Sequence, residues 1–166
     1  IELCVEAGGN PSHPPLLMIM GLGSQMIFWP NHFVKRLIDA GFFVIRFDNR
    51  DIGLSSKVQI DGLPRISQLK MMMRLQTGLS NKGAQVAYNL TDMAEDTARL
   101  IKALQLGKTH LLGASMGGMI AQIVAARYPS LIQRMALMFT TTNRAFLKPP
   151  KPRQLYTLIN RPESHS

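Results

Sequence analysis

Short, continuous runs of apolar residues alternate along the chain with longer segments in which apolar positions recur every three or four residues. The short runs are typical of strands that are buried on both faces of a sheet. They lie at 16–20, 42–47, 109–114 and 134–140. The longer segments have helical spacing, and they lie at 29–40, from Thr91 to Gly107 and at 116–127. Because such alternation is typical of right-handed βαβ crossovers, the sequence predicts an α/β fold with a doubly wound, mostly parallel sheet.

The ends of the predicted helices carry recognisable signals. Gly41 and Gly107 stand where a glycine commonly ends a helix. Thr91 is placed to be the N-cap of the helix that follows it, and the acidic residues of the first turn complement the helix dipole. The predicted buried face of this helix consists of Met93, Ala94, Thr97, Leu100, Ile101 and Leu104. Residues 1–7 alternate only weakly, and the Gly- and Pro-rich turn after them ends any strand there.

The alternation of strands and helices breaks down at Lys148-Pro149-Pro150-Lys151-Pro152. We therefore expect residues 1–143 to form the N-terminal part of an α/β core and residues 144–166 to be a linker or the start of a helical cap. Residues 57–90 are less regular, and we assign no function to them. Their methionine cluster, Met71-Met72-Met73, is interpreted as packing.

Composition excludes several classes of protein. Cys4 is the only cysteine, which excludes an internal disulfide framework and fits a reducing compartment, so we expect a cytoplasmic location. No apolar run reaches the roughly 18 residues that a transmembrane helix needs. The formal net charge is +9, but Lys and Arg are scattered, so we expect neither nucleic acid nor a membrane as a partner. The chain begins at Ile1, and we expect its N-terminus to be truncated.

The segment Gly113-Ala114-Ser115-Met116-Gly117 matches the pattern G-x-S-x-G and lies between a predicted strand and a predicted helix. In this context the pattern indicates a nucleophile elbow, a sharp turn that exposes a serine hydroxyl above the carboxyl edge of a sheet. We expect Ser115 to have a strained backbone conformation that is rarely populated. Gly113 and Gly117 remove side chains that would collide with the turn or with the neighbouring strand. The N-terminus of the next helix places the backbone N–H of Met116 where an oxyanion would form. The alternative is a tight turn without catalysis.

A second oxyanion donor is expected from the glycine loop Met20-Gly21-Leu22-Gly23, which follows the first buried strand. With this loop, the elbow, and Asp48-Asn49-Arg50-Asp51-Ile52-Gly53-Leu54-Ser55 as a D-x-R-x-x-G-x-S segment, the chain resembles the N-terminal portion of the α/β-hydrolase superfamily. The residues of these motifs are most similar to those of bacterial esterases of the aclacinomycin methylesterase group. The resemblance implies that Ser115 is the nucleophile and that the N–H groups of Leu22 and Met116 form the oxyanion hole. Met20 departs from the pattern, because many relatives have His there.

The remaining parts of a catalytic triad are not recognisable. A serine nucleophile needs a general base that a carboxylate orients, and in this fold both follow the serine along the chain. After Ser115 the only acid is Glu163 and the only histidine is His165, and both lie in a polar tail. We therefore expect an incomplete hydrolase that lacks its C-terminal strands, and we expect the 166 residues alone to be inactive.

Other polar residues of the chain have structural interpretations. Asp48 closes a buried strand and is expected to accept hydrogen bonds from nearby backbone N–H groups. Arg50 and Asp51 are expected to pair with each other. His110 lies within a strand and His32 caps or flanks a helix, so neither is expected to be the base.

The leading functional hypothesis is a serine hydrolase that cleaves carboxylic esters through an acyl-enzyme on Ser115. The elbow alone leaves open a cofactor-free haloperoxidase, an acyltransferase or a non-catalytic ligand-binding protein. Phe28 and Trp29 favour a small apolar ester as substrate, although packing explains them equally well. No cofactor is expected, and no metal, because no pair of histidines has ligand spacing. The strand at 134–140 is expected to be an exposed edge, which a homo-oligomer would cover.

Overall fold

The computed structural model describes residues 1–58 and 87–142, and these residues belong to one compact unit. The predicted linker or cap at 144–166 and the Met71-Met72-Met73 cluster lie outside the described residues. The elements in chain order are β1 (Val5–Gly8), β2 (Pro15–Ile19), the 3₁₀ turn η1 (Met26–Phe28), α1 (Asn31–Asp39), β3 (Phe43–Phe47), α3 (Leu90–Ala103), β4 (Thr109–Ala114), α4 (Met116–Arg127), the 3₁₀ turn η2 (Pro129–Leu131) and β5 (Ile132–Met138).

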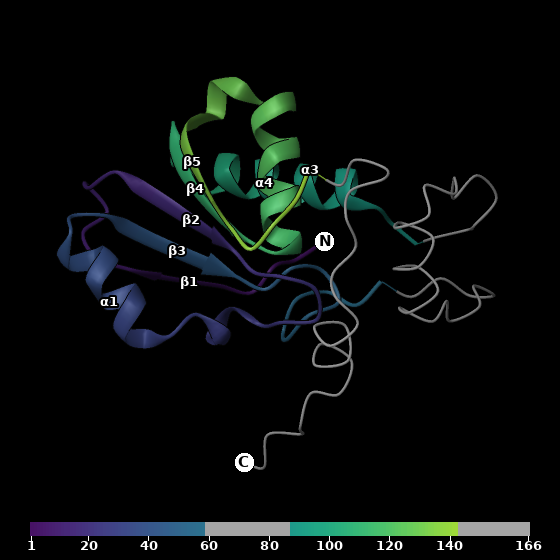
Figure 1. The fold of residues 1–166 in the computed structure, drawn as a ribbon, viewed down its shortest axis with the longest axis horizontal. Helices are drawn as coiled ribbons and strands as arrows, with labels where there is room; N and C mark the ends of the chain where they lie inside the picture. The colour runs from purple at the N-terminus through teal and green to yellow at the C-terminus, as the bar shows by residue number, and fades with distance from the viewer. Residues whose placement is uncertain (59–86, 143–166) are drawn as a thin grey trace, which may run out of the picture. The chain divides into compact units, whose positions relative to one another are not determined.

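The five strands form one twisted sheet in the order β1-β3-β2-β4-β5 (Figure 1). β3, β2, β4 and β5 run parallel to one another, and β1 pairs with β3 in the antiparallel sense. The predicted fold class, a mostly parallel α/β sheet, is therefore confirmed. β4 pairs with β2, which lies far away in sequence, so the chain crosses over the sheet between them and brings the ends of both strands to the same edge.

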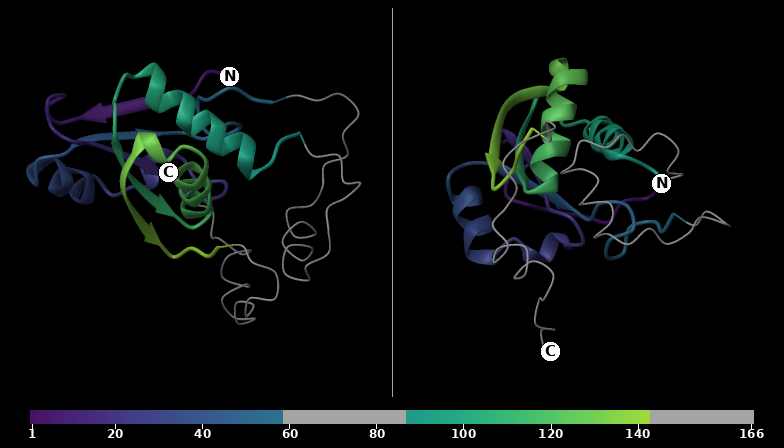
Figure 2. Two further views of the ribbon diagram at one scale, coloured as in Figure 1. Left: turned by 90° about the horizontal axis from the view of Figure 1, so that it is seen from above. Right: turned by 45° about the vertical axis from the view of Figure 1, so that its right-hand side comes forward.

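Helices cover the two faces of the sheet, as expected of a doubly wound fold. Figure 2 shows α1 on one side of the strands and α3 with α4 on the other. Under α3 and α4, inward-facing residues such as Leu17, Ile45 and Leu111 are almost fully buried. Under α1, the core is built from Leu16, Met18, Trp29, Val44 and Leu112. Successive residues of β2 thus pack into different cores, which explains why this strand is apolar without interruption.

The predicted N-cap of α3 is wrong by two residues. Asn89, not Thr91, is the N-cap, and its side-chain oxygen accepts hydrogen bonds from the backbone N–H groups of Thr91 (2.7 Å) and Asp92 (3.3 Å). The carboxylate of Asp92 accepts a bond of 2.7 Å from the N–H of Asn89, which completes a capping box. Both Asn89 and Thr91 are good capping residues, and the reciprocal bond with Asp92 favours Asn89. The prediction that Leu104 belongs to the buried face of this helix is also wrong. Leu104 lies beyond the end of the helix and is 42% exposed.

β5 begins at Ile132 and ends at Met138, so the predicted strand at 134–140 is shifted by two residues. Phe139 is not part of the strand, because its backbone φ is 50° and its side chain is 91% exposed. Among the described strands, β5 has a neighbour on one side only, as predicted for an edge. In the described part of the chain, no helix combines the length and the apolarity that crossing a bilayer requires.

Candidate active site

Ser115 lies at the sharp turn between β4 and α4. Its backbone has φ 53° and ψ −121°, a combination that residues other than glycine rarely adopt. Such strain persists only where the surrounding structure enforces it, and it is typical of functional turns. The prediction of an unusual backbone at Ser115 is therefore confirmed.

The hydroxyl of Ser115 is not used for capping. A serine at the N-cap of a helix usually accepts a hydrogen bond from an N–H in the first turn. Ser115 occupies the N-cap of α4 but makes no such side-chain bond, and the residue is exposed. The turn therefore leaves the hydroxyl available at the surface.

The two elbow glycines are required by close packing. A Cβ at Gly113 would lie 2.5 Å from the carbonyl oxygen of Gly117 and 2.6 Å from the Cα of Gly118. A Cβ at Gly117 would overlap the carbonyl group of Ile19 at the end of β2. These obstacles are backbone atoms, which cannot rotate away. The steric reason that the sequence suggests for Gly113 and Gly117 is thus confirmed, and the neighbouring strand in question is β2.

The glycine loop after β2 lies directly against Ser115. A Cβ at Gly21 would be 3.1 Å from the Cβ and 3.5 Å from the Oγ of Ser115. The loop is turned by a bond of 3.3 Å from the N–H of Ser24 to the carbonyl of Gly21. The fold therefore brings the glycine loop, which carries the expected donor Leu22, next to Ser115, and the other expected donor, Met116, follows Ser115 directly in the chain. No hydrogen bond between described residues uses the N–H of Leu22.

The loop after β3 anchors the glycine loop. The amide of Asn49, which is 3% exposed, donates a hydrogen bond of 3.2 Å to the carbonyl of Met20. Asp48 accepts a bond of 2.6 Å from the backbone N–H of Met26, as expected of a structural aspartate. Sequence reasoning missed the role of Asn49. Its position two residues after the end of a buried strand was the one available signal, since polar residues there meet at the carboxyl edge of the sheet.

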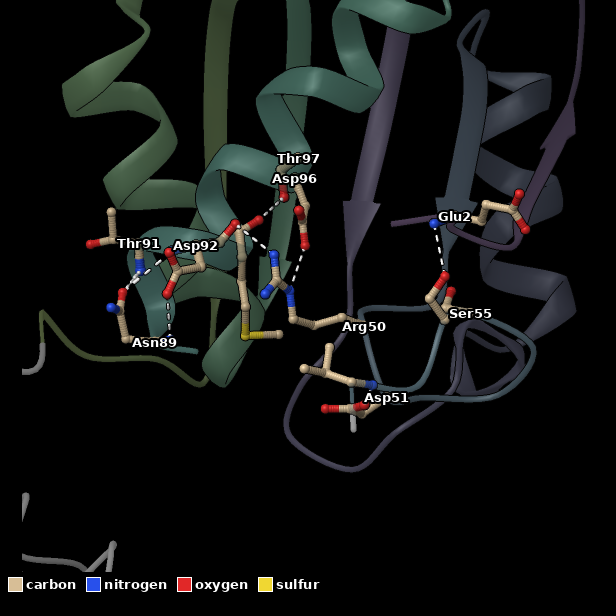
Figure 3. A network of polar contacts seen from close by, with 12 residues as sticks. Glu2, Arg50, Asp51, Ser55, Asn89, Thr91, Asp92, Asp96 and Thr97 are labelled. Atoms are coloured by element: carbon tan, nitrogen blue, oxygen red, sulfur yellow. Dashed lines mark hydrogen bonds and ion pairs between the residues drawn. The ribbon is translucent and has the colours of Figure 1, made fainter. Parts of the chain in front are cut away.

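Arg50 does not pair with Asp51, contrary to the prediction. Its Nε donates a hydrogen bond of 2.7 Å to the carboxylate of Asp96 on α3, as Figure 3 shows. The hydrogen bond to Asp96 is the main cause that raises the pKa of Arg50 above its ordinary value. The guanidinium also lies 4.8 Å from the ring centre of Tyr88. Asp51 instead accepts a bond of 2.6 Å from the backbone N–H of Val58, so both residues have structural partners.

Tyr88 has a strongly raised pKa. Burial is the main cause, and a hydrogen bond to Asp51 adds to it. The phenol therefore stays neutral at physiological pH, and its ring packs against the guanidinium of Arg50.

The described histidines do not form a base for Ser115. His110 packs edge-on against the ring of Phe42, with 5.6 Å between the ring centres. His32 lies inside the first turn of α1, whose N-cap is Pro30, so the prediction that it caps or flanks the helix is wrong. Trp29 is 4% exposed and packs with Phe33, which makes it a core residue. Phe28, by contrast, is 54% exposed.

Comparison with known proteins identifies the family. The family model described as alpha/beta hydrolase fold matches residues 14–158. The chain therefore belongs to the α/β-hydrolase fold family.

Relatives of the chain include a methylesterase and a depolymerase. It is 30% identical over 138 residues to rhodomycin D methylesterase DnrP of Streptomyces peucetius, a match that covers 83% of this chain and 39% of that protein. It is 28% identical over 153 residues to the poly(3-hydroxyalkanoate) depolymerase of Ectopseudomonas oleovorans, covering 92% of this chain and 44% of the relative. The resemblance to methylesterases is thus confirmed. The chain spans about two fifths of the length of these relatives.

A solved structure shows the same fold. The enol-lactonase from Burkholderia xenovorans LB400 aligns with a TM-score of 0.62 and 24% sequence identity. The alignment covers 83% of this chain and 43% of the lactonase. At this identity the likeness describes the fold alone.

Proposed function

We propose that this chain carries the nucleophile and the oxyanion hole of a serine hydrolase that cleaves carboxylic esters. The observation that carries the proposal is the placement of Ser115 in a strained turn, with its hydroxyl uncapped and the glycine loop packed against it. This is the arrangement that acyl transfer needs, a nucleophile beside preorganised N–H donors.

In the proposed reaction, the Oγ of Ser115 attacks the ester carbonyl, and its proton goes to a general base. The N–H groups of Leu22 and Met116 stabilise the negative charge on the carbonyl oxygen, because they are fixed before the reaction begins. The alcohol then leaves with a proton, and water hydrolyses the acyl-enzyme on Ser115. None of the described histidines is placed to be the base. The proposal therefore assigns the base and its carboxylate partner to none of the described residues.

The proposed substrate is a small apolar ester. Three apolar side chains are exposed here, one on the expected oxyanion donor itself and two in η1, which follows it along the chain. They are Leu22 (43% exposed), Ile27 (63%) and Phe28 (54%). The name of one relative, rhodomycin D methylesterase, supports an ester as the substrate.

The test uses the protein expressed from its complete reading frame, with p-nitrophenyl esters of increasing acyl length. Wild type is expected to hydrolyse them and to be labelled by a fluorophosphonate. Ser115→Ala is expected to lower kcat by about 10³-fold to 10⁶-fold, with a remainder from the oxyanion hole. Ser130→Ala is the control, because Ser130 is an exposed serine in η2. Equal labelling of wild type and Ser115→Ala would refute the assignment.

Two further assays of the same protein separate an esterase from an acyltransferase and from a haloperoxidase. An acyltransferase would pass the acyl group to an added alcohol in preference to water, and a haloperoxidase would brominate an added acceptor when peroxide and bromide are supplied. We expect hydrolysis to dominate in both assays.

A further inference from the structure

Ser115 is held by the chain segment at the end of β5. The hydroxyl of Thr140 donates a hydrogen bond of 2.6 Å to the carbonyl oxygen of Ser115. The backbone N–H of Ser115 donates a bond of 2.9 Å to the carbonyl of Met138. Both backbone polar groups of the strained residue therefore have partners, and the segment from Met138 to Thr140 supplies one partner to each.

The carbonyl that Thr140 contacts belongs to the same peptide unit as the N–H of Met116. In a planar trans peptide the C=O and the N–H point in opposite directions. A group that fixes the carbonyl of Ser115 therefore also fixes the direction of the expected oxyanion donor at Met116. The N–H groups of Gly118 (3.0 Å) and Met119 (3.4 Å) contact the same oxygen from within the helix, and their longer distances make Thr140 the closest of the three donors.

The side chain of Thr140 packs closely against α4. A Cβ at Gly118 would lie 2.6 Å from the Cβ and Cγ2 of Thr140 and 2.7 Å from its Oγ1. The side-chain amide of Gln122 donates to the carbonyls of Gly118 (3.1 Å) and Thr141 (3.0 Å), which ties α4 to the segment after β5. The missing side chain at Gly118 thus makes room for the Thr140 hydroxyl.

We propose that Thr140 is a positioning residue of the oxyanion hole, an inference that rests on the proposed esterase function. Its hydroxyl holds the Ser115–Met116 peptide in the orientation that aims the Met116 N–H at the oxyanion. A hydrogen bond to the carbonyl also polarises the peptide unit, which makes its N–H a stronger donor. The oxyanion carries its charge in the transition state and the tetrahedral intermediate but not in the bound substrate, so the loss of this contact is expected to slow the reaction without weakening substrate binding.

The test compares three variants in the protein expressed from its complete reading frame. Thr140→Val keeps the shape of the side chain and removes the hydroxyl, Thr140→Ser keeps the hydroxyl, and Thr142→Val is the matched control at an exposed threonine. The readouts are kcat and KM for p-nitrophenyl butyrate and the inhibition constant of a trifluoromethyl ketone, which forms a transition-state-like adduct with the serine. For Thr140→Val we expect kcat to fall by about 10-fold to 100-fold, less than the loss of a whole donor. We expect the inhibition constant to rise by a similar factor and KM to stay within twofold.

Thr140→Ser is expected to recover most of kcat, and Thr142→Val to match wild type. If Thr140→Val does not fold, as thermal unfolding would show, the pair Thr140→Ser and Thr140→Ala decides, because these variants differ only in the hydroxyl. An active wild type that depends on Ser115, together with an unchanged kcat in Thr140→Val, would overturn this inference and leave the proposed function standing. A wild type without Ser115-dependent hydrolysis would overturn the proposed function, and this inference with it.

Discussion

The carboxylate of Asp48, directly after β3, accepts a hydrogen bond of 2.6 Å from the backbone N–H of Met26 at the start of η1. Asp48 is 3% exposed, so the bond is formed away from solvent. The same carboxylate fills the space beside Gly53, where a Cβ would overlap its Oδ2. One side chain thus joins the loop after β3 to η1, which follows the glycine loop along the chain.

Asp48→Ala is expected to lower the free energy of unfolding by about 2–3 kcal/mol, because it removes a charged acceptor and leaves the buried N–H of Met26 unpaired. It is also expected to lower kcat, since the glycine loop loses its support. Asp48→Asn is the matched control, because the amide oxygen still accepts the bond, and a smaller loss is expected. Denaturant unfolding and ester hydrolysis of the complete protein measure both effects. An equal free energy of unfolding for wild type and Asp48→Ala would show that the bond does not stabilise the fold.

Gly117→Ala is expected to lower the free energy of unfolding more than the substitution of a glycine whose backbone φ is positive. The backbone φ of Gly117 is not in the left-handed region, but a Cβ there would overlap the backbone carbonyl of Ile19. Gly107, with φ 67°, has open space around its Cβ position. Gly107→Ala is therefore expected to cost about 1 kcal/mol, and Gly117→Ala more than about 3 kcal/mol, at the upper end of single substitutions. Denaturant midpoints rank the two, and the reverse order would contradict the packing argument.

The ion pair between Arg50 and Asp96 is expected to stabilise the position of α3. The two side chains are only 10% and 13% exposed, so Asp96→Asn leaves a nearly buried guanidinium without its charge partner. Removal of one partner from such a pair costs about 3–5 kcal/mol when burial is complete, and we expect about half of that here. Asp39→Asn is the matched control, because the Lys35–Asp39 pair is 73% and 57% exposed, and its loss is expected to cost less than about 0.5 kcal/mol. Equal losses in the two variants would refute the difference in burial as the cause.

The 166-residue chain expressed alone is expected to self-associate through β5. Met135 and Leu137 are 38% and 41% exposed on this strand, and the strand has no partner on its outer side among the described residues. Such an edge pairs readily with another copy. Leu137→Lys is expected to reduce the association, whereas Leu104→Lys, at an equally exposed leucine after α3, is expected not to. Sedimentation velocity measures the difference, and a soluble monomer of 18.5 kDa would contradict the prediction.

The sequence alone determined the type of most elements and the place of the proposed nucleophile. Strands and helices could be predicted because the period of apolar residues depends only on local geometry, two residues in a strand and 3.6 in a helix. The elbow could be located because its glycines and Ser115 lie within five consecutive residues. The strained backbone at Ser115 followed from the same short pattern and is confirmed.

The tertiary structure decided everything that depends on contacts between distant parts of the chain. Asp96 is 46 residues from Arg50, and no local rule ranks it above the adjacent Asp51. Thr140 reaches Ser115 across 25 residues, and Gly21 lies against Ser115 only because β2 and β4 are neighbours in the sheet. Sequence patterns indicate which residues are buried and which form turns. Strand order decides which side chains come into contact, and that order is set by the packing of the whole domain.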